Sequence, residues 1–120
     1  MSISSLGLRT VIYPTADLGA AKDWWASLLG LEPYFDEAFY VGFNVAGYEL
    51  GLLPSASTTD GALAYWGVYD VQAAIDAAVA SGATVHMPAS DVGDGIITGS
   101  IRTPDGSVAG FIHNPHFTLG

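Results

Sequence analysis

A pattern of aspartate, a branched aliphatic residue and paired alanines occurs twice in this chain. It reads Asp17-Leu18-x-Ala20-Ala21-x-Asp23 and, further on, Asp70-Val71-x-Ala73-Ala74-x-Asp76. Each leading aspartate suits a helix N-cap, because its side-chain oxygen can accept hydrogen bonds from unpaired backbone N–H groups. Apolar residues then recur at helical spacing until a glycine ends the run, at Gly30 and at Gly82. The repetition predicts two copies of one structural unit.

Segments typical of β-strands surround the two predicted helices in the same order. One strand is predicted before each helix, at 8–13 and 63–69. After the first helix we expect two or three short strands within 34–54, with a turn near Ala46-Gly47. The strands expected after the second helix lie at 84–88, 96–103 and 108–114, and the residues 103–107 form a turn between the last two.

Each half therefore has the order βαβββ. We predict an α+β fold in which two tandem βαβββ modules, about 6–54 and 62–115, form one domain of residues 1–120. A module alone would leave an apolar sheet face exposed, so the two are expected to build a curved mixed sheet around a concave pocket.

Composition excludes several classes of function. The chain has no cysteine, which excludes disulfides and zinc–thiolate sites. No apolar run approaches the roughly 20 residues of a membrane span, and the N-terminus lacks a signal-like segment, so we expect a soluble, cytoplasmic protein without a membrane partner. Twelve acidic residues against three basic ones give a formal charge of −9, which argues against nucleic acid as a partner. The acidity either favours a cationic ligand or provides a solvated surface.

Three segments carry a resemblance to a known superfamily, and they read TADLGAAKDWWASLLGLEP, VYDVQAAIDAAVASGATV and TPDGSVAGFIHNP. In this order they resemble the vicinal oxygen chelate superfamily, which includes glyoxalase I, bleomycin-resistance proteins, fosfomycin-resistance enzymes and extradiol dioxygenases. The resemblance covers nearly the whole chain. It implies the fold and a homodimer, but not the reaction, because this fold hosts several chemistries.

In metal-dependent members of that superfamily, four strands direct ligands at one divalent ion. The resemblance places the four positions at Thr10, Glu49, Ala64 and Gly110. Only Glu49 is a plausible ligand, whereas catalytic sites of this kind use about three protein ligands. We therefore expect no metal and no cofactor, and the sequence identifies no catalytic residue.

The histidines offer no clear alternative metal site. His113 and His116 have suitable spacing, but the intervening Pro115 disfavours a helical pairing, and His86 is distant in sequence. Each is expected to lie at the surface or to take part in packing.

Strand alternation predicts which residues line the pocket. It places Thr10, Glu49, Ala64, Trp66 and Gly110 on one face, where the small residues would leave room beside Trp66. Trp66 would either stack on a planar or cationic ligand or pack in the core. Glu49 would either pair with an amine or guanidinium or be an exposed edge residue.

Three further features have alternative roles. Of Tyr40 and Phe43, one is expected to reach the pocket and the other to pack under a helix. Arg102 would bind an acidic group of a ligand or pair with Asp105 or Asp94. The segment 91–95 is expected to be either a lid over the pocket or a solvated connection.

The leading hypothesis is a metal-free protein that binds a small aromatic or cationic compound, to sequester or carry it. The alternative is an enzyme, either a glyoxalase-like lyase or isomerase or a dioxygenase, that uses Glu49 in a different metal set. A third possibility is a fold that serves mainly as an interaction platform. The sequence leaves open whether the protein is an enzyme.

Overall fold

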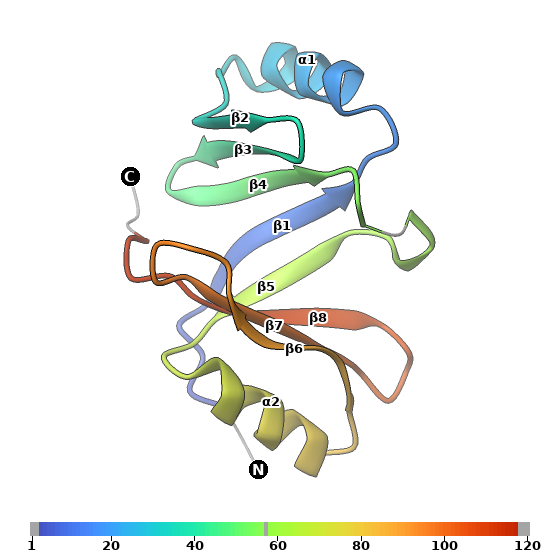
Figure 1. Ribbon diagram of the computed structural model, residues 1–120, viewed down its shortest axis with the longest axis vertical. Coiled ribbons are helices and arrows are strands. Elements are labelled where there is room, and N and C mark those ends of the chain that lie inside the picture. Colours follow the sequence, from blue (N-terminus) through green and yellow to red (C-terminus); the bar gives the residue numbers. More distant parts are fainter. Residues whose placement is uncertain (1–2, 57, 118–120) are drawn as a thin grey trace. The chain divides into compact units, whose positions relative to one another are not determined.

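The computed structural model describes residues 3–56 and 58–117, and this part of the chain forms two α-helices and eight strands (Figure 1). It divides into two compact units, which we describe separately. The N-terminal unit comprises Thr10–Leu63, and the C-terminal unit comprises Ala64–Phe117 together with the residues up to Arg9. The elements are β1 (Leu8–Pro14), α1 (Leu18–Leu29), β2 (Phe35–Glu37), β3 (Tyr40–Val45), β4 (Tyr48–Leu53), a 3-10 turn (Thr58–Asp60), β5 (Leu63–Gly67), α2 (Val71–Ala80), β6 (Thr84–Asp91), β7 (Ile97–Arg102) and β8 (Val108–His113).

The strands of the N-terminal unit lie in the order β2-β3-β4-β1. β1 runs parallel to β4, and the other neighbours are antiparallel. The turn between β3 and β4 has Ala46 at φ 54° and Gly47 at φ 95°. Two consecutive residues with positive φ match the right-handed twist of a two-residue hairpin, which confirms the turn predicted there.

α1 begins and ends as the sequence predicts. The Asp17 side chain accepts a hydrogen bond from the Ala20 backbone N–H at 3.1 Å, and Gly30 ends the helix in a left-handed conformation. The helix covers one face of its sheet, where the buried residues are Val41, Phe43, Leu50 and Leu52. No residue of α1 itself is buried, so this core is formed mainly by the strands.

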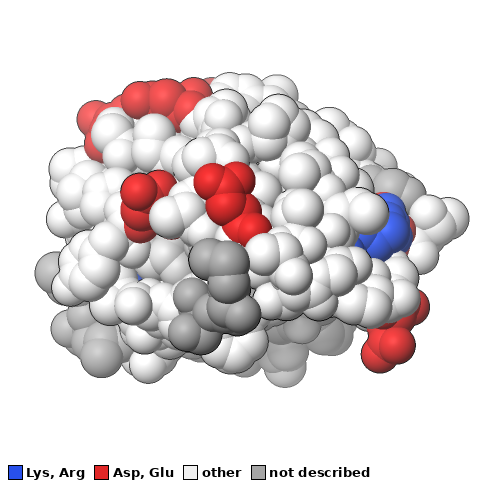
Figure 2. All heavy atoms as spheres, turned by 90° about the horizontal axis from the view of Figure 1, so that it is seen from below, with Lys and Arg blue, Asp and Glu red and all other residues white. Residues whose placement is uncertain are grey.

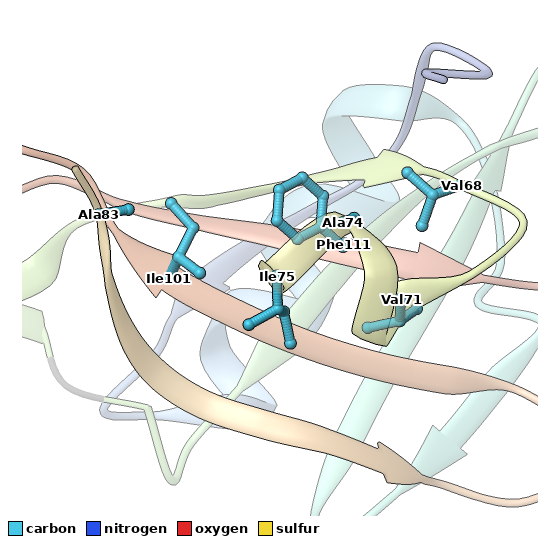
Figure 3. Close-up of a cluster of buried hydrophobic side chains, with 7 residues drawn as sticks. All are labelled: Val68, Val71, Ala74, Ile75, Ala83, Ile101 and Phe111. Atoms are coloured by element: carbon cyan, nitrogen blue, oxygen red, sulfur yellow. The ribbon is translucent and has the colours of Figure 1, made fainter. Parts of the chain in front are cut away.

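The C-terminal unit repeats the topology with the strand order β5-β8-β7-β6. β5 runs parallel to β8, as β1 does to β4. Asp70 caps α2 by accepting the Ala73 N–H at 3.0 Å. Figure 3 shows the buried cluster of this unit, in which Ile75 of α2 lies against side chains of the sheet such as Ile101 and Phe111.

The α+β class and the two βαβββ modules are thus confirmed. The expected strands after α1 number three, of which β2 is short, and β6 extends beyond the predicted segment to Asp91. The organisation as a single domain around one concave pocket stays a prediction. None of the helices in the described residues is long and apolar enough to span a membrane. On the surface seen in Figure 2, acidic side chains lie in separate groups with uncharged residues between them.

Candidate functional site: the Glu49 cluster

A carboxylate lies on the sheet face of the N-terminal unit that is opposite α1. Thr10 of β1 and Glu49 of β4 are register partners on adjacent parallel strands. The buried Thr10 hydroxyl donates a hydrogen bond to Glu49 Oε1 at 3.2 Å. The Tyr34 hydroxyl, from the segment before β2, donates to the other oxygen, Oε2. Both oxygens of the carboxylate are therefore fixed by side chains of the same unit.

Two glycines form the floor on which the tyrosine rings lie. Gly42 of β3 and Gly51 of β4 are register partners on the same face as Glu49. A Cβ atom at Gly42 would lie 3.0 Å from Tyr34 Cε1 and 3.0 Å from Glu49 Oε2. A Cβ atom at Gly51 would lie 2.7 Å from Tyr40 Cζ. A larger residue at either position would push against the ring that lies on it. We call Thr10, Tyr34, Tyr40 and Glu49 the Glu49 cluster.

The charge of Glu49 is not neutralised by a basic side chain. Within residues 3–56 and 58–117, no Lys, Arg or His lies within ion-pair distance of it, and Lys22 is paired instead with Asp36 at 3.1 Å. Burial, then the hydrogen bond to Glu49, then its negative charge raise the pKa of Tyr34 well above the ordinary value. Tyr34 therefore stays a protonated donor at neutral pH.

The structure brings together three of the residues singled out in the sequence, namely Thr10, Glu49 and Tyr40. It does not bring Phe43 to them. Phe43 has no exposed surface and lies in the core beneath α1, on the opposite face of the sheet from Tyr40. This settles which of the two aromatic residues shares a face with Glu49, because alternate residues of a strand point to opposite faces.

The prediction that Ala64 and Trp66 share a face with Gly110 is wrong. Their register partners in β8 are Ala109 and Phe111, and Phe111 belongs to the core beneath α2. Ala64 and Trp66 therefore lie on the helix-covered face of the C-terminal unit. The residue paired with Gly110 is Tyr65.

The space expected at Gly110 is filled. A Cβ atom there would lie 2.8 Å from Tyr65 Cγ and closer still to the ring edge, so the Tyr65 ring lies directly on the glycine. Burial raises the pKa of the Tyr65 hydroxyl above its ordinary value. On the same face, His86 Nδ1 and the buried Ser100 Oγ form a hydrogen bond of 2.9 Å.

Arg102 and the segment 91–95 take part in turns of the C-terminal unit. Arg102 Nη1 donates to the Gly106 carbonyl at 2.7 Å, within the turn that joins β7 and β8. The Asp91 side chain accepts the Gly93 N–H, and His116 Nε2 is hydrogen-bonded to the Asp94 carbonyl at 2.9 Å. These contacts stabilise the loops themselves. The ligand-binding role of Arg102 and the role of 91–95 as a lid stay predictions.

The residues at the superfamily's ligand positions do not fit a catalytic divalent ion. In the part of the chain that the structure describes, no three His, Asp or Glu side chains gather closely enough to hold a metal. The N-terminal unit offers one carboxylate, whose oxygens already accept hydrogen bonds, and the C-terminal unit offers a glycine covered by Tyr65.

Tyr65 and Tyr34 lie on these faces but were not predicted from the sequence. For Tyr65 a signal exists, because side chains alternate along a strand and Tyr65 therefore shares a face with Leu63 and Gly67. Tyr34 precedes β2, so no strand pattern indicates its direction.

A hollow of about 410 Å³ also lies in the N-terminal unit, lined by residues of α1, β2 and β3 that include Lys22, Asp36 and Glu37.

The sequence matches the family model of the Glyoxalase/Bleomycin resistance protein/Dioxygenase superfamily over residues 7–111. The chain belongs to this superfamily. Among proteins with curated descriptions, none matches it.

Solved structures of the superfamily share the fold at low identity. A glyoxalase/bleomycin resistance protein/dioxygenase superfamily member from Vibrio splendidus 12B01 is 19% identical over 88% of this chain and 97% of its own, with a TM-score of 0.68. Methylmalonyl-CoA epimerase from Mycobacterium tuberculosis is 15% identical over 94% and 91%, with a TM-score of 0.71. The Mn(II)-bound glyoxalase from Novosphingobium aromaticivorans is 20% identical over 91% of this chain and 39% of its own, with a TM-score of 0.68.

Proposed function

We propose that this superfamily member binds a small aromatic or cationic molecule at the Glu49 cluster without the help of a metal. The observation that supports this most is a carboxylate without a basic partner, held beside two tyrosine rings on a sheet face. Small-molecule sites combine aromatic surface with a few fixed polar groups. The Glu49 cluster has both.

The charges of the chain favour the same class of ligand. With a formal charge of −9, the protein attracts cations and repels anions at long range. Close to the cluster, a cation gains from Glu49 and from the negative faces of the tyrosine rings. Binding would serve to sequester or carry the compound, and we propose that the protein acts as a homodimer in the cytoplasm.

Metal content and ligand binding test the proposal together. Purified protein is analysed for bound metal, and its binding to a panel of planar aromatic and cationic compounds is followed by NMR, with and without a chelator. We expect binding that the chelator leaves unchanged. Glu49→Gln, which keeps the shape but removes the charge, should weaken the binding of cations about tenfold or more, as expected for a hydrogen bond to a charged group.

Glu32→Gln is the matched control, because Glu32 is exposed and lies outside the Glu49 cluster. It should leave the affinity unchanged. Stoichiometric metal together with turnover that a chelator abolishes would establish a metal-dependent lyase, isomerase or dioxygenase instead. Absence of binding across the whole panel would also overturn the proposal.

A further inference from the structure

We propose that the ligand of the Glu49 cluster is an aryl-alkyl ammonium ion with N–H donors, and that Thr10 and Tyr34 are positioning residues that direct Glu49 toward it. This inference rests on the proposed function and narrows it to one chemical class.

The carboxylate has acceptor positions left for a ligand. An ionised carboxylate can accept about four hydrogen bonds. Two donors of the described residues use this capacity, the Thr10 hydroxyl on Oε1 and the Tyr34 hydroxyl on Oε2. The remaining positions suit the N–H groups of an ammonium ion, which carries several donors and no acceptor. A quaternary ammonium has the charge but no such donor, and an anion would be repelled.

The two bound hydroxyls hold the carboxylate in one orientation. Without them, Glu49 would have to lose side-chain freedom when the ligand binds, which lowers affinity. Neither hydroxyl brings a formal charge, so the negative charge of Glu49 remains available to attract the ammonium ion. Thr10 and Tyr34 therefore act through Glu49.

The aryl part of the ligand is assigned from the neighbouring rings. Phe35 of β2 is the register partner of Gly42 and so lies on the same face as Glu49. Its ring centroid lies 6.1 Å from that of Tyr40 and 5.9 Å from that of Phe39. Phe35 and Phe39 are 38% and 65% exposed, which leaves aromatic surface available next to Tyr40. A flat ring attached to the ammonium group by a short chain would reach this surface.

Four probes of similar shape test the ligand class on the full chain. They are phenethylamine, its N,N,N-trimethyl derivative, phenethyl alcohol and 3-phenylpropionate, and their affinities are measured by NMR titration. Phenethylamine should bind at least about tenfold more tightly than the trimethyl derivative or the alcohol, because the trimethyl derivative has no N–H donor, and the alcohol has no positive charge and only one donor. Phenylpropionate should bind most weakly.

Two variants test the roles of the residues. Glu49→Gln should remove the preference for phenethylamine over phenethyl alcohol. Tyr34→Phe keeps the ring. It should lower the affinity for phenethylamine severalfold and leave the affinity for phenethyl alcohol unchanged, a difference that a merely structural role would not produce. Tyr69→Phe is the control, since Tyr69 is 74% exposed and lies in the other unit.

The outcomes separate this inference from the proposed function. If phenethyl alcohol or phenylpropionate binds as tightly as phenethylamine, the ammonium class is overturned while small-molecule binding stands. If none of the four probes binds, the ammonium class is also overturned, and the wider panel decides the proposed function. A tighter complex with Tyr34→Phe would show that the phenol competes with the ligand rather than positioning Glu49. The comparison of probes on the unmodified protein remains decisive where a variant fails to fold.

Discussion

The two modules share a topology and a helix cap, yet their helices are packed very differently. In α2, four residues are buried, namely Val71, Ala74, Ile75 and Ala77. In α1, none is. The caps are nearly identical, with Asp17 and Asp70 accepting backbone N–H groups at 3.1 and 3.0 Å. The difference therefore arises not from the caps but from the helical residues, beginning with the buried Val71 and its counterpart Leu18, which is not buried.

Side-chain size explains the contrast. α2 presents small and branched residues to its sheet, and they fit between the strands. At the corresponding positions α1 carries Trp24 and Trp25, whose rings remain partly exposed. The ring centroid of Trp25 lies 5.4 Å from that of Tyr13, on which it stacks, and 5.0 Å from that of Trp24, which it meets edge-on. The C-terminal unit thus has the better-packed helix, while the N-terminal unit carries the only carboxylate at the ligand positions of the superfamily.

The largest effect is expected from emptying the core beneath α2. Ile75→Ala should lower the free energy of unfolding by about 2–5 kcal/mol, because Ile75 is 2% exposed and its loss leaves a cavity. Leu28→Ala in α1 should cost less than about 0.5 kcal/mol, since Leu28 is 62% exposed. Denaturant unfolding measures both. Equal losses would show that α1 contributes as much to stability as α2 does.

A smaller effect is expected where tyrosine rings lie on glycines. Gly110→Ala should destabilise the protein by about 1–3 kcal/mol, because the new methyl group meets Tyr65 near the root of its ring. Gly51→Ala should lower the free energy of unfolding by less, since the new methyl group meets the hydroxyl end of the Tyr40 side chain, which can move aside. In a Tyr65→Ala background the cost of Gly110→Ala should fall. A cost unchanged in that background would mean that Tyr65 is not the obstacle.

The smallest effect appears only at alkaline pH, in the Glu49 cluster. The pKa of Tyr34 is raised in the folded protein, whereas in the unfolded chain it is about 10. Above that pH the folded state retains a proton that the unfolded state has lost, so stability falls as pH rises. Tyr34→Phe should reduce this fall, although it also removes the hydrogen bond to Glu49 at neutral pH. Phenolate absorbance followed against pH should lose one late-titrating group. In Glu49→Gln, Tyr34 should titrate earlier, because both an acceptor and a negative charge are gone.

Local signals made much of the fold predictable. The two caps, the glycines that end the helices and the turn at Ala46-Gly47 depend on the conformational preferences of a few neighbouring residues. The shared face of Thr10 and Glu49 was also predictable, because the superfamily resemblance places both residues at ligand positions, which point to the same side of the sheet.

The face of β5 was misassigned by one residue. Thr10 lies seven residues before the cap Asp17, but Ala64 lies six before Asp70. The residue seven positions before Asp70 is Leu63, which lies on the same face of the strand as Tyr65. Because side chains alternate along a strand, an offset of one residue exchanges the two faces completely. The sequence therefore contained the signal for Tyr65, whereas nothing in it indicated that Tyr34 reaches Glu49 across fifteen positions of the chain.

Residue identity and short-range periodicity are enough to predict the duplicated βαβββ order and the positions of both helices. The side chains that surround Glu49 and the ring that fills the space above Gly110 are known only from the folded chain. Such contacts join residues that are distant in the chain, and they depend on register and on the direction of each ring, which are fixed only when the strands pair.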